Sequence, residues 1–355
     1  LAVAALVVIA GCTTGPRRSD DAVDPAAYTN CQDPDAAAAW QRAQAALAKG
    51  DDAAALPDLV LVTSGCPDLV RAHLAWQDVA RRLGGDAERT MRAFYADLPE
   101  RRSPVPAYLR ARLAGTPYEQ GKTLEAILAA DPSFAWAHLS LARVMRRQSR
   151  LLPAFEHYSK AIVNDPGLHE ALGERGQVLA ELGRDVEAAA DFKAYLVAQP
   201  DDLQAAREYV ALVLYRVGRF DEAQTWLDRL AAKSPGDANV RLDGAALLWR
   251  CGAHRRAADE YLAILRETPT VVLAALNLGL LYYEVAPKNE AEYQRYWPRA
   301  RAAFRWYLDA GASAEGHEQF EQALGVPFRL QRIAELLGPE PLRAVRLDDL
   351  QWPEG

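Results

Sequence analysis

Apolar and polar positions repeat about every 34 residues along the middle of the chain, between Asp131 and Thr270. Each repeat closes with a proline, and the prolines stand 34, 34, 35 and 34 residues apart: Pro132, Pro166, Pro200, Pro235 and Pro269. A period of this length predicts a stack of helix–turn–helix units. We therefore expect a solenoid in which each unit buries its apolar face against its neighbours.

Four further positions recur when each unit is numbered with its proline at position 32. Position 8 is small, position 15 is usually glycine, position 20 is alanine and position 24 is bulky. Small residues let two antiparallel helices approach closely, and the bulky residue fills the remaining space. Glycine ends the first helix because it adopts a left-handed backbone cheaply. Position 8 is occupied by Ala142, Gly176, Ala211, Ala245 and Gly279, and position 15 by Ser149, Gly183, Gly218 and Gly252. Position 20 is occupied by Ala154, Ala188, Ala223, Ala257 and Ala300, and position 24 by Tyr158, Phe192, Leu227, Tyr261 and Phe304.

This pattern resembles the tetratricopeptide repeat family. The unit that begins at Ala135 carries the family's Leu, Gly/Ala, Ala, Phe/Tyr, Ala and Pro as Leu141, Ala142, Ala154, Tyr158, Ala161 and Pro166. The other units begin at His169, Gln204, Ala238 and Val272, and all five lack the family's tryptophan at position 4. The resemblance implies an all-α tetratricopeptide-repeat superhelix that binds proteins.

Weaker units precede and follow the regular ones. Residues 36–134 are expected to form degenerate hairpins that start at Ala36, Val70 and Arg101, and residues 135–310 form the regular repeats, about eight hairpins in all. The last unit carries an insertion at 286–298, whose three aromatic residues either contact a partner or pack over the end of the stack. Residues 311–355 are expected to form a helical cap, because the last repeat needs its apolar face covered.

The N-terminal segment resembles a bacterial lipoprotein signal. Its apolar run ends in Ile9-Ala10-Gly11-Cys12, which predicts a signal peptide at 1–11 and acyl chains on Cys12. Several acyl chains hold a protein on a bilayer where one is marginal. Residues 12–35 then form the lipidated, flexible tether. We expect the protein on the periplasmic side of the outer membrane, while an ordinary secretory signal remains the alternative.

The other cysteines are predicted to differ in role. Cys31 precedes the first hairpin and Cys66 ends it, so antiparallel helices would bring the two together. Export permits a disulfide between them. Cys251 falls where a buried apolar residue is expected, and we interpret it as a reduced core thiol.

Composition and motifs narrow the function class. The chain has 355 residues and a net charge of −7, without a basic stripe, which argues against nucleic-acid binding. His169-Glu170 is not followed by the second histidine of a zinc-binding HExxH motif. The sequence also lacks CxxC, GxSxG and P-loop motifs. We therefore predict no catalytic residues, no cofactor and no metal.

The resemblance implies a partner-binding groove lined by the first helix of each hairpin. Its residues at positions 2, 9, 12 and 13 are arginines and aromatics, which binding hot spots favour. The predicted groove residues are Trp136, Arg143, Arg146, Arg147, Tyr215, Arg216, Trp249, Arg250 and Tyr283. Packing of these aromatics against the next repeat is the alternative. The preferred function is a lipid-anchored adaptor for protein partners of envelope assembly or secretion machinery, and the runner-up is a receptor for a peptide, glycan or lipid.

Overall fold

The computed structural model describes residues 31–98, 103–114, 116–285, 289–311, 325–339 and 344–353. The predicted signal peptide, the lipidation site Cys12 and residues 12–30 of the tether lie outside these ranges. Every regular element in the described ranges is a helix. The chain divides into two compact units, Leu1–Pro166 and Gly167–Gly355. None of the helices in these ranges is long and apolar enough to cross a membrane.

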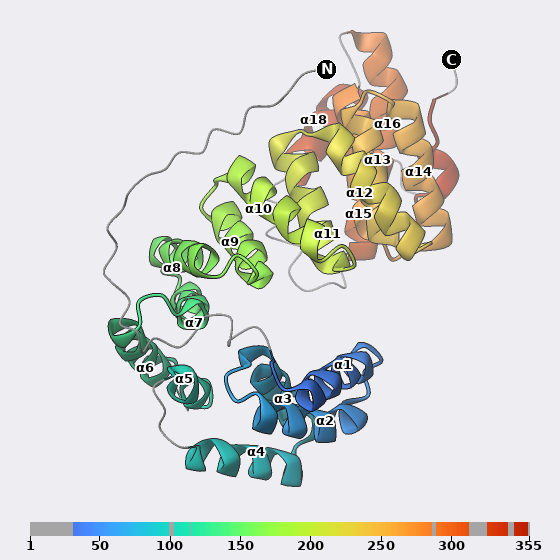
Figure 1. Ribbon diagram of the computed structural model, residues 1–355. Coiled ribbons are helices and arrows are strands. Elements are labelled where there is room, and N and C mark those ends of the chain that lie inside the picture. The colour runs from blue at the N-terminus through green and yellow to red at the C-terminus, as the bar shows by residue number, and fades with distance from the viewer. Residues whose placement is uncertain are drawn as a thin grey trace, which may run out of the picture. The chain divides into compact units, whose positions relative to one another are not determined.

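The first unit consists of four antiparallel helical hairpins (Figure 1). They are α1 (Pro34–Ala48) with α2 (Asp52–Gly65), α3 (Val70–Leu83) with α4 (Gly85–Asp97), α5 (Val105–Ala111) with α6 (Pro117–Ala130), and α7 (Ala135–Arg147) with α8 (Leu151–Asn164). The three degenerate hairpins that the sequence predicts are therefore present. The predicted start at Arg101 lies outside the described residues.

The second unit contains four more hairpins and part of a cap. The hairpins are α9 (His169–Glu181) with α10 (Asp185–Ala198), α11 (Leu203–Ala211) and its continuation η2 (Leu212–Val217) with α12 (Phe220–Lys233), α13 (Ala238–Arg250) with α14 (His254–Glu267), and α15 (Val272–Val285) with α16 (Glu290–Gly311). The described parts of the cap are α18 (Val326–Leu337) and the short 3₁₀-helix η3 (Leu347–Leu350). The described residues thus hold eight hairpins, as the period predicts.

The periodic residues occupy the places that the pattern predicts. All five prolines lie in four-residue loops between one hairpin and the next. Gly183, Gly218 and Gly252 have φ angles between 76° and 79°, and Ser149 has a φ of 58°, so position 15 is left-handed in all four units. The five alanines at position 20 are fully buried, and the bulky residues at position 24 are at most 4% exposed.

One repeat departs from the predicted register. The spacing of 35 residues between Pro200 and Pro235 leaves one extra residue, and the structure absorbs it in the π-helix η2. A π-helical turn holds one residue more than an α-helical turn. Helix α11 consequently begins at Leu203, one residue before the predicted start, and Val210 is buried in place of Ala211. The prediction that Ala211 is a buried position-8 contact is therefore wrong.

The insertion in the last hairpin lengthens a helix. Residues 290–298 form the first turns of α16, which runs through Pro298, while 286–288 lie outside the described residues. Tyr293, Tyr296 and Trp297 all pack against the core of the second unit. Of the two alternatives raised for these aromatics, the structure shows packing over the end of the stack.

The cysteines fall into two classes. Cys31 and Cys66 form a disulfide with a Cα–Cα distance of 5.5 Å, which links the segment before α1 to the end of α2. Cys251 is a free thiol at the C-terminal end of α13, and it is exposed. The prediction of a buried core thiol is therefore wrong, because Cys251 is the C-cap residue that follows the last residue of α13 and lies in the exposed turn before α14.

Candidate functional site

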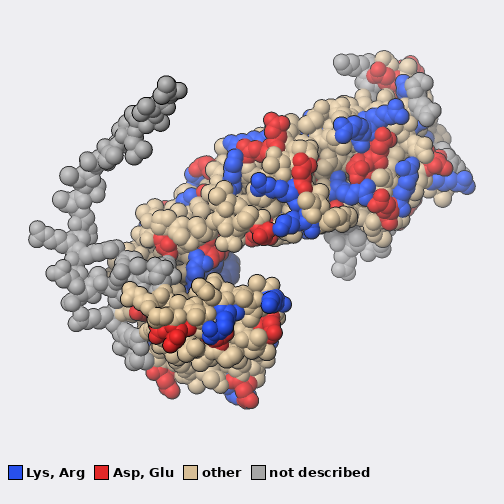
Figure 2. Space-filling model, turned by 45° about the vertical axis from the view of Figure 1, so that its right-hand side comes forward, with Lys and Arg blue, Asp and Glu red and all other residues tan. Residues whose placement is uncertain are grey.

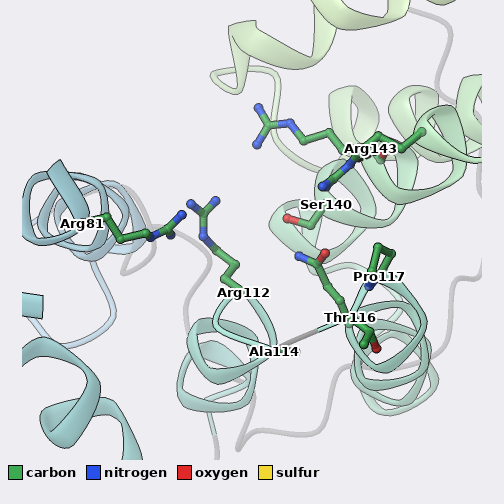
Figure 3. A pocket seen from close by; sticks show the side chains of 9 residues that line it. Arg81, Arg112, Ala114, Thr116, Pro117, Ser140 and Arg143 are labelled. Atoms are coloured by element: carbon green, nitrogen blue, oxygen red, sulfur yellow. Dashed lines mark hydrogen bonds between the residues drawn. The ribbon is translucent and has the colours of Figure 1, made fainter. Parts of the chain in front are cut away.

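A polar pocket of about 370 Å³ opens on the first unit (Figure 3). It lies where α3, the end of α5, the start of α6 and α7 meet. The lining residues are Arg81, Arg112, Ala114, Thr116, Pro117, Gln120, Ser140, Arg143 and Arg147. Four of these nine residues are arginines, and no lining residue is a carboxylate. We call this site the arginine pocket.

Three consecutive hairpins supply the four guanidinium groups. Arg81 lies in the last turn of α3, Arg112 caps the C-terminal end of α5, and Arg143 and Arg147 stand one turn apart on α7. Figure 3 shows the Arg81 and Arg112 side chains directed toward one another. Such an arrangement requires that something negative offset the repulsion between like charges.

Asp78 provides part of that offset from outside the pocket lining. Its carboxylate oxygen Oδ1 lies 3.6 Å from a guanidinium nitrogen of both Arg81 and Arg112. Arg112 is also held in place, because its Nε donates to Oε1 of Gln77 at 3.1 Å. The side-chain amide of Gln77 in turn donates to the backbone carbonyl of Leu109 at 3.2 Å. One carboxylate therefore faces two of the arginines.

The start of α6 lines the same pocket. Thr116 is the N-cap of α6, Pro117 is its first residue, and Gln120 lies in its first turn. Pro117 has no backbone N–H, and the Thr116 hydroxyl accepts a hydrogen bond from the N–H of Glu119 at 3.2 Å, so the helix start is already capped by its own residues. The four guanidinium groups of the pocket therefore suit a carboxylate or another oxyanion, which arginine binds through two parallel hydrogen bonds.

The predicted groove residues of the first unit divide between this pocket and the core. Arg143 and Arg147 line the pocket, and Arg146 is partly exposed on the same helix. Trp136 is only 3% exposed and its ring lies under the guanidinium of Arg71, 5.4 Å from the ring centroid. The prediction of Trp136 as a contact residue is therefore wrong, because α3 covers it.

In the second unit the predicted aromatic and arginine residues hold the repeats together. Tyr215 is 47% exposed, but its hydroxyl donates to Asp243 of the next hairpin at 2.7 Å. Arg216 donates to the carbonyl of Ala180 at 2.9 Å and pairs with Asp185. Burial raises the pKa of Asp243, and its hydrogen bond from Tyr215 opposes that rise. These contacts run from one hairpin to the next.

The remaining predicted residues of the second unit differ in exposure. Trp249 is half-buried against the core, and Arg250 is exposed. Tyr283 stacks on Trp297 with ring centroids 5.1 Å apart, and Arg329 of α18 lies over its ring. Tyr283 is therefore partly buried against other residues of the chain, which favours the packing alternative for this residue. Acidic and basic side chains are mixed over the face of the molecule in Figure 2, as pairs such as Arg241 with Glu260 indicate.

Sequence reasoning missed Arg81 and Arg112, although the sequence held a signal for them. Counted from the unit starts at Val70 and Arg101, both residues occupy position 12, the position of Arg146 in the next unit. Three successive units thus place an arginine at one position. The degenerate alignment of the first hairpins hid this, because their position-20 alanines are replaced by Arg89 and Gln120.

Two histidines that the sequence shows as scattered are paired in the structure. His138 Nδ1 lies 2.9 Å from His157 Nδ1, and His138 Nε2 lies 3.0 Å from the Pro132 carbonyl. The carbonyl requires a proton on Nε2 of His138, so His157 donates to its Nδ1. Burial, together with His138, lowers the pKa of His157 to about 4. The pair is neutral near pH 7 and ties α8 to α7. Among the described residues, no group of three or more potential metal ligands occurs.

Comparisons with known proteins identify the repeats. The family model of the tetratricopeptide repeat matches residues 168–202 and 210–272. No curated protein matches the sequence. Similar solved structures include YrrB, titled a TPR protein with an unusual peptide-binding site (16% identity, TM-score 0.42, 57% of this chain and 99% of that one). A tetratricopeptide repeat protein from Parabacteroides merdae has 15% identity and a TM-score of 0.40, over 83% of this chain and 100% of that one. Pseudomonas aeruginosa PilF has 18% identity and a TM-score of 0.39, over 66% and 92%. Scores of this size say nothing about a shared partner.

Proposed function

Because this chain is a tetratricopeptide repeat protein, a kind of protein that serves as an interaction scaffold, we propose that it binds a protein partner without catalysing a reaction. The partner presents an acidic segment, and the arginine pocket holds it. The observation that carries this proposal is the convergence of Arg81, Arg112, Arg143 and Arg147 on one pocket whose lining has no carboxylate. A carboxylate from the partner would join Asp78 in neutralising them.

The geometry favours side-chain carboxylates over a flat apolar contact. Ser140 and Gln120 add neutral polar groups to the arginines, and the Ser140 hydroxyl already lies 3.0 Å from the hydroxyl of Tyr108. Arg147 donates through its Nε to the carbonyl of Arg143 at 3.3 Å, which ties these two pocket residues together. Charge-assisted bonds of this kind contribute about 1.5–3 kcal/mol each when they are shielded from water.

A fluorescent octaglutamate peptide tests the pocket directly. The double variant Arg81→Ala/Arg147→Ala should bind this peptide at least about tenfold more weakly than the unmodified chain, a change of about 1.4 kcal/mol. Binding by the unmodified chain should also weaken as salt rises, since the contact is between charges. Fluorescence anisotropy at 50 and 300 mM salt measures both effects, and circular dichroism checks that the variants remain helical.

The matched control removes the same charge from the other side of the same unit. Arg89 and Arg92 lie on α4, outside the pocket, and pair with Asp86 and Glu88. The variant Arg89→Ala/Arg92→Ala should keep its affinity within about twofold, because screened surface charges contribute little. If both double variants lost the same affinity for the peptide, its binding would depend on the net charge of the protein alone, and the pocket would not be its binding site.

We also propose that Cys12 carries acyl chains that hold this scaffold on the periplasmic face of the bacterial outer membrane, where its partners belong to an envelope machine. The supporting observation is the sequence Ile9-Ala10-Gly11-Cys12 before a polar segment. Expression with its native signal in a Gram-negative host should place the chain in the membrane fraction, and Cys12→Ala should release it. Intact mass spectrometry should find the added acyl mass on Cys12. An unmodified Cys12, or equal fractionation of both forms, would contradict the proposal.

A further inference from the structure

The segment 344–353 lies on the second unit as a short chain with little helix of its own. Only η3 (Leu347–Leu350) is regular, and the backbone N–H of Arg346 donates to the Asp349 carboxylate at 2.8 Å to start it. The segment packs against α16 and, through η3, against α14. We call residues 344–353 the tail and the surface beneath it the tail groove.

Side chains of the groove bind the backbone of the tail. The hydroxyl of Tyr282 on α15 donates to the carbonyl of Leu350 at 2.7 Å. Arg299 on α16 donates through Nε to the carbonyl of Gln351 at 2.7 Å, and Arg295, one turn earlier, reaches the carbonyl of Pro353 at 3.3 Å. Helices that pack together satisfy their own backbone groups, so this pattern is typical of a bound extended peptide.

Several tail side chains pack against the second unit: Val345 and Leu347 are partly buried against its core, Pro353 is buried, and Leu350 and Trp352 stand two residues apart. Leu350 is fully buried in the core of the second unit. The ring of Trp352 lies between two tyrosines, 5.7 Å from the Tyr282 centroid and 5.3 Å from that of Tyr296. Between them, Gln351 is exposed. The groove therefore holds a leucine and an aromatic residue two positions apart and binds the carbonyls of Leu350, Gln351 and Pro353.

We propose that the tail groove is a peptide-binding site for an extended segment with leucine and tryptophan at positions i and i+2, and that the chain's own tail occupies it. The lengthened helix α16 builds the site, because Arg295, Tyr296 and Arg299 all belong to it. This site goes beyond the arginine pocket, which belongs to the first unit and takes acidic groups. An incoming segment with the same two side chains competes with the tail.

A synthetic peptide of residues 344–353 with a fluorescent label tests this in full-length protein. In the opened variant, Leu350→Ala/Trp352→Ala, the tail loses both groove side chains, so the labelled peptide should bind saturably and at least about tenfold more tightly than it binds the unmodified chain. The same peptide with both residues replaced by alanine should not bind. Adding Tyr296→Ala to the opened variant should lower the affinity at least about tenfold.

Hydrogen exchange of the unmodified chain covers the case in which the opened variant does not fold. Excess unlabelled peptide should accelerate amide exchange in residues 347–353, because the peptide displaces the tail. Unchanged exchange at saturating peptide would overturn the proposal and leave the tail as a permanent cap. Equal binding of the peptide to the opened and unmodified chains would overturn it as well, since the groove would then not be the site.

Discussion

Replacing Cys31 and Cys66 together by serine is expected to lower the free energy of unfolding of the first unit by about 4 kcal/mol. The bond closes a loop between residues 35 positions apart, and cross-linking a loop of that length restricts the unfolded chain by about this amount. The loss should stay near α1 and α2, since hairpins in a solenoid contact only their neighbours. Protection of the second unit should therefore change little.

Hydrogen exchange with mass spectrometry, resolved by peptide, measures the effect in each unit separately. The control is Cys251→Ser, which removes an exposed thiol that is in no disulfide and should leave both units unchanged. A double serine variant whose first hairpin keeps its protection would show that the bond does not stabilise it. Loss of protection spread evenly over the chain would contradict the expected confinement to neighbouring hairpins.

Gly279→Ala and Gly244→Ala, the same substitution in neighbouring first helices, should shift stability in opposite directions. A Cβ on Gly279 in α15 would lie 2.6 Å from two ring atoms of Phe304, which is itself fully buried. Overpacking of this kind costs about 1–3 kcal/mol. A Cβ on Gly244 in α13 meets nothing within 4 Å, so alanine should add about 0.5–1 kcal/mol there by favouring the helix.

Urea denaturation followed by tryptophan fluorescence and circular dichroism compares the two variants with the parent chain. The free energies of unfolding of the two variants should differ by about 1.5–4 kcal/mol, with Gly279→Ala below the parent and Gly244→Ala above it. A further variant, Phe304→Leu on the Gly279→Ala background, should recover part of the loss because it removes the ring that the new methyl group meets. If Phe304→Leu restores none of the lost stability, the contact with Phe304 is not the cause of the loss.

The period of the prolines and alanines predicts most of the fold, because the prolines mark the loops between hairpins and the alanines mark the close contacts between helices. Pro132 and its four equivalents lie in the loops, and Ala188 lies fully buried between two helices. The pattern did not predict which structure the chain adopts where a repeat is longer than 34 residues. The extra residue before Pro235 became a π-helix, and the insertion after Val285 became part of α16.

The candidate site was harder to predict than the fold. The groove residues were chosen by their position in the family's repeat, and that position does not tell which other side chains pack around them. Of the predicted groove residues, Arg143 and Arg147 line the pocket. Trp136 is covered by Arg71, and Tyr283 stacks on Trp297. Whether a side chain at such a position is available depends on residues of other hairpins. The contact between α3 and Trp136 joins residues far apart in sequence, and single-chain periodicity does not report it.

The π-helix η2 also shows how one repeat accommodates an additional residue. A codon inserted into the middle of a rigid α-helix turns every later side chain by about 100°, which would remove the following residues from the core. Here one wide turn takes up the extra residue, so that Tyr209 and Val210 before it are buried and Gly218 after it has a left-handed φ of 78°, as position 15 does in the other units. A one-residue insertion into the first helix of another hairpin is therefore expected to be tolerated where a π-turn can form before the glycine that ends the helix.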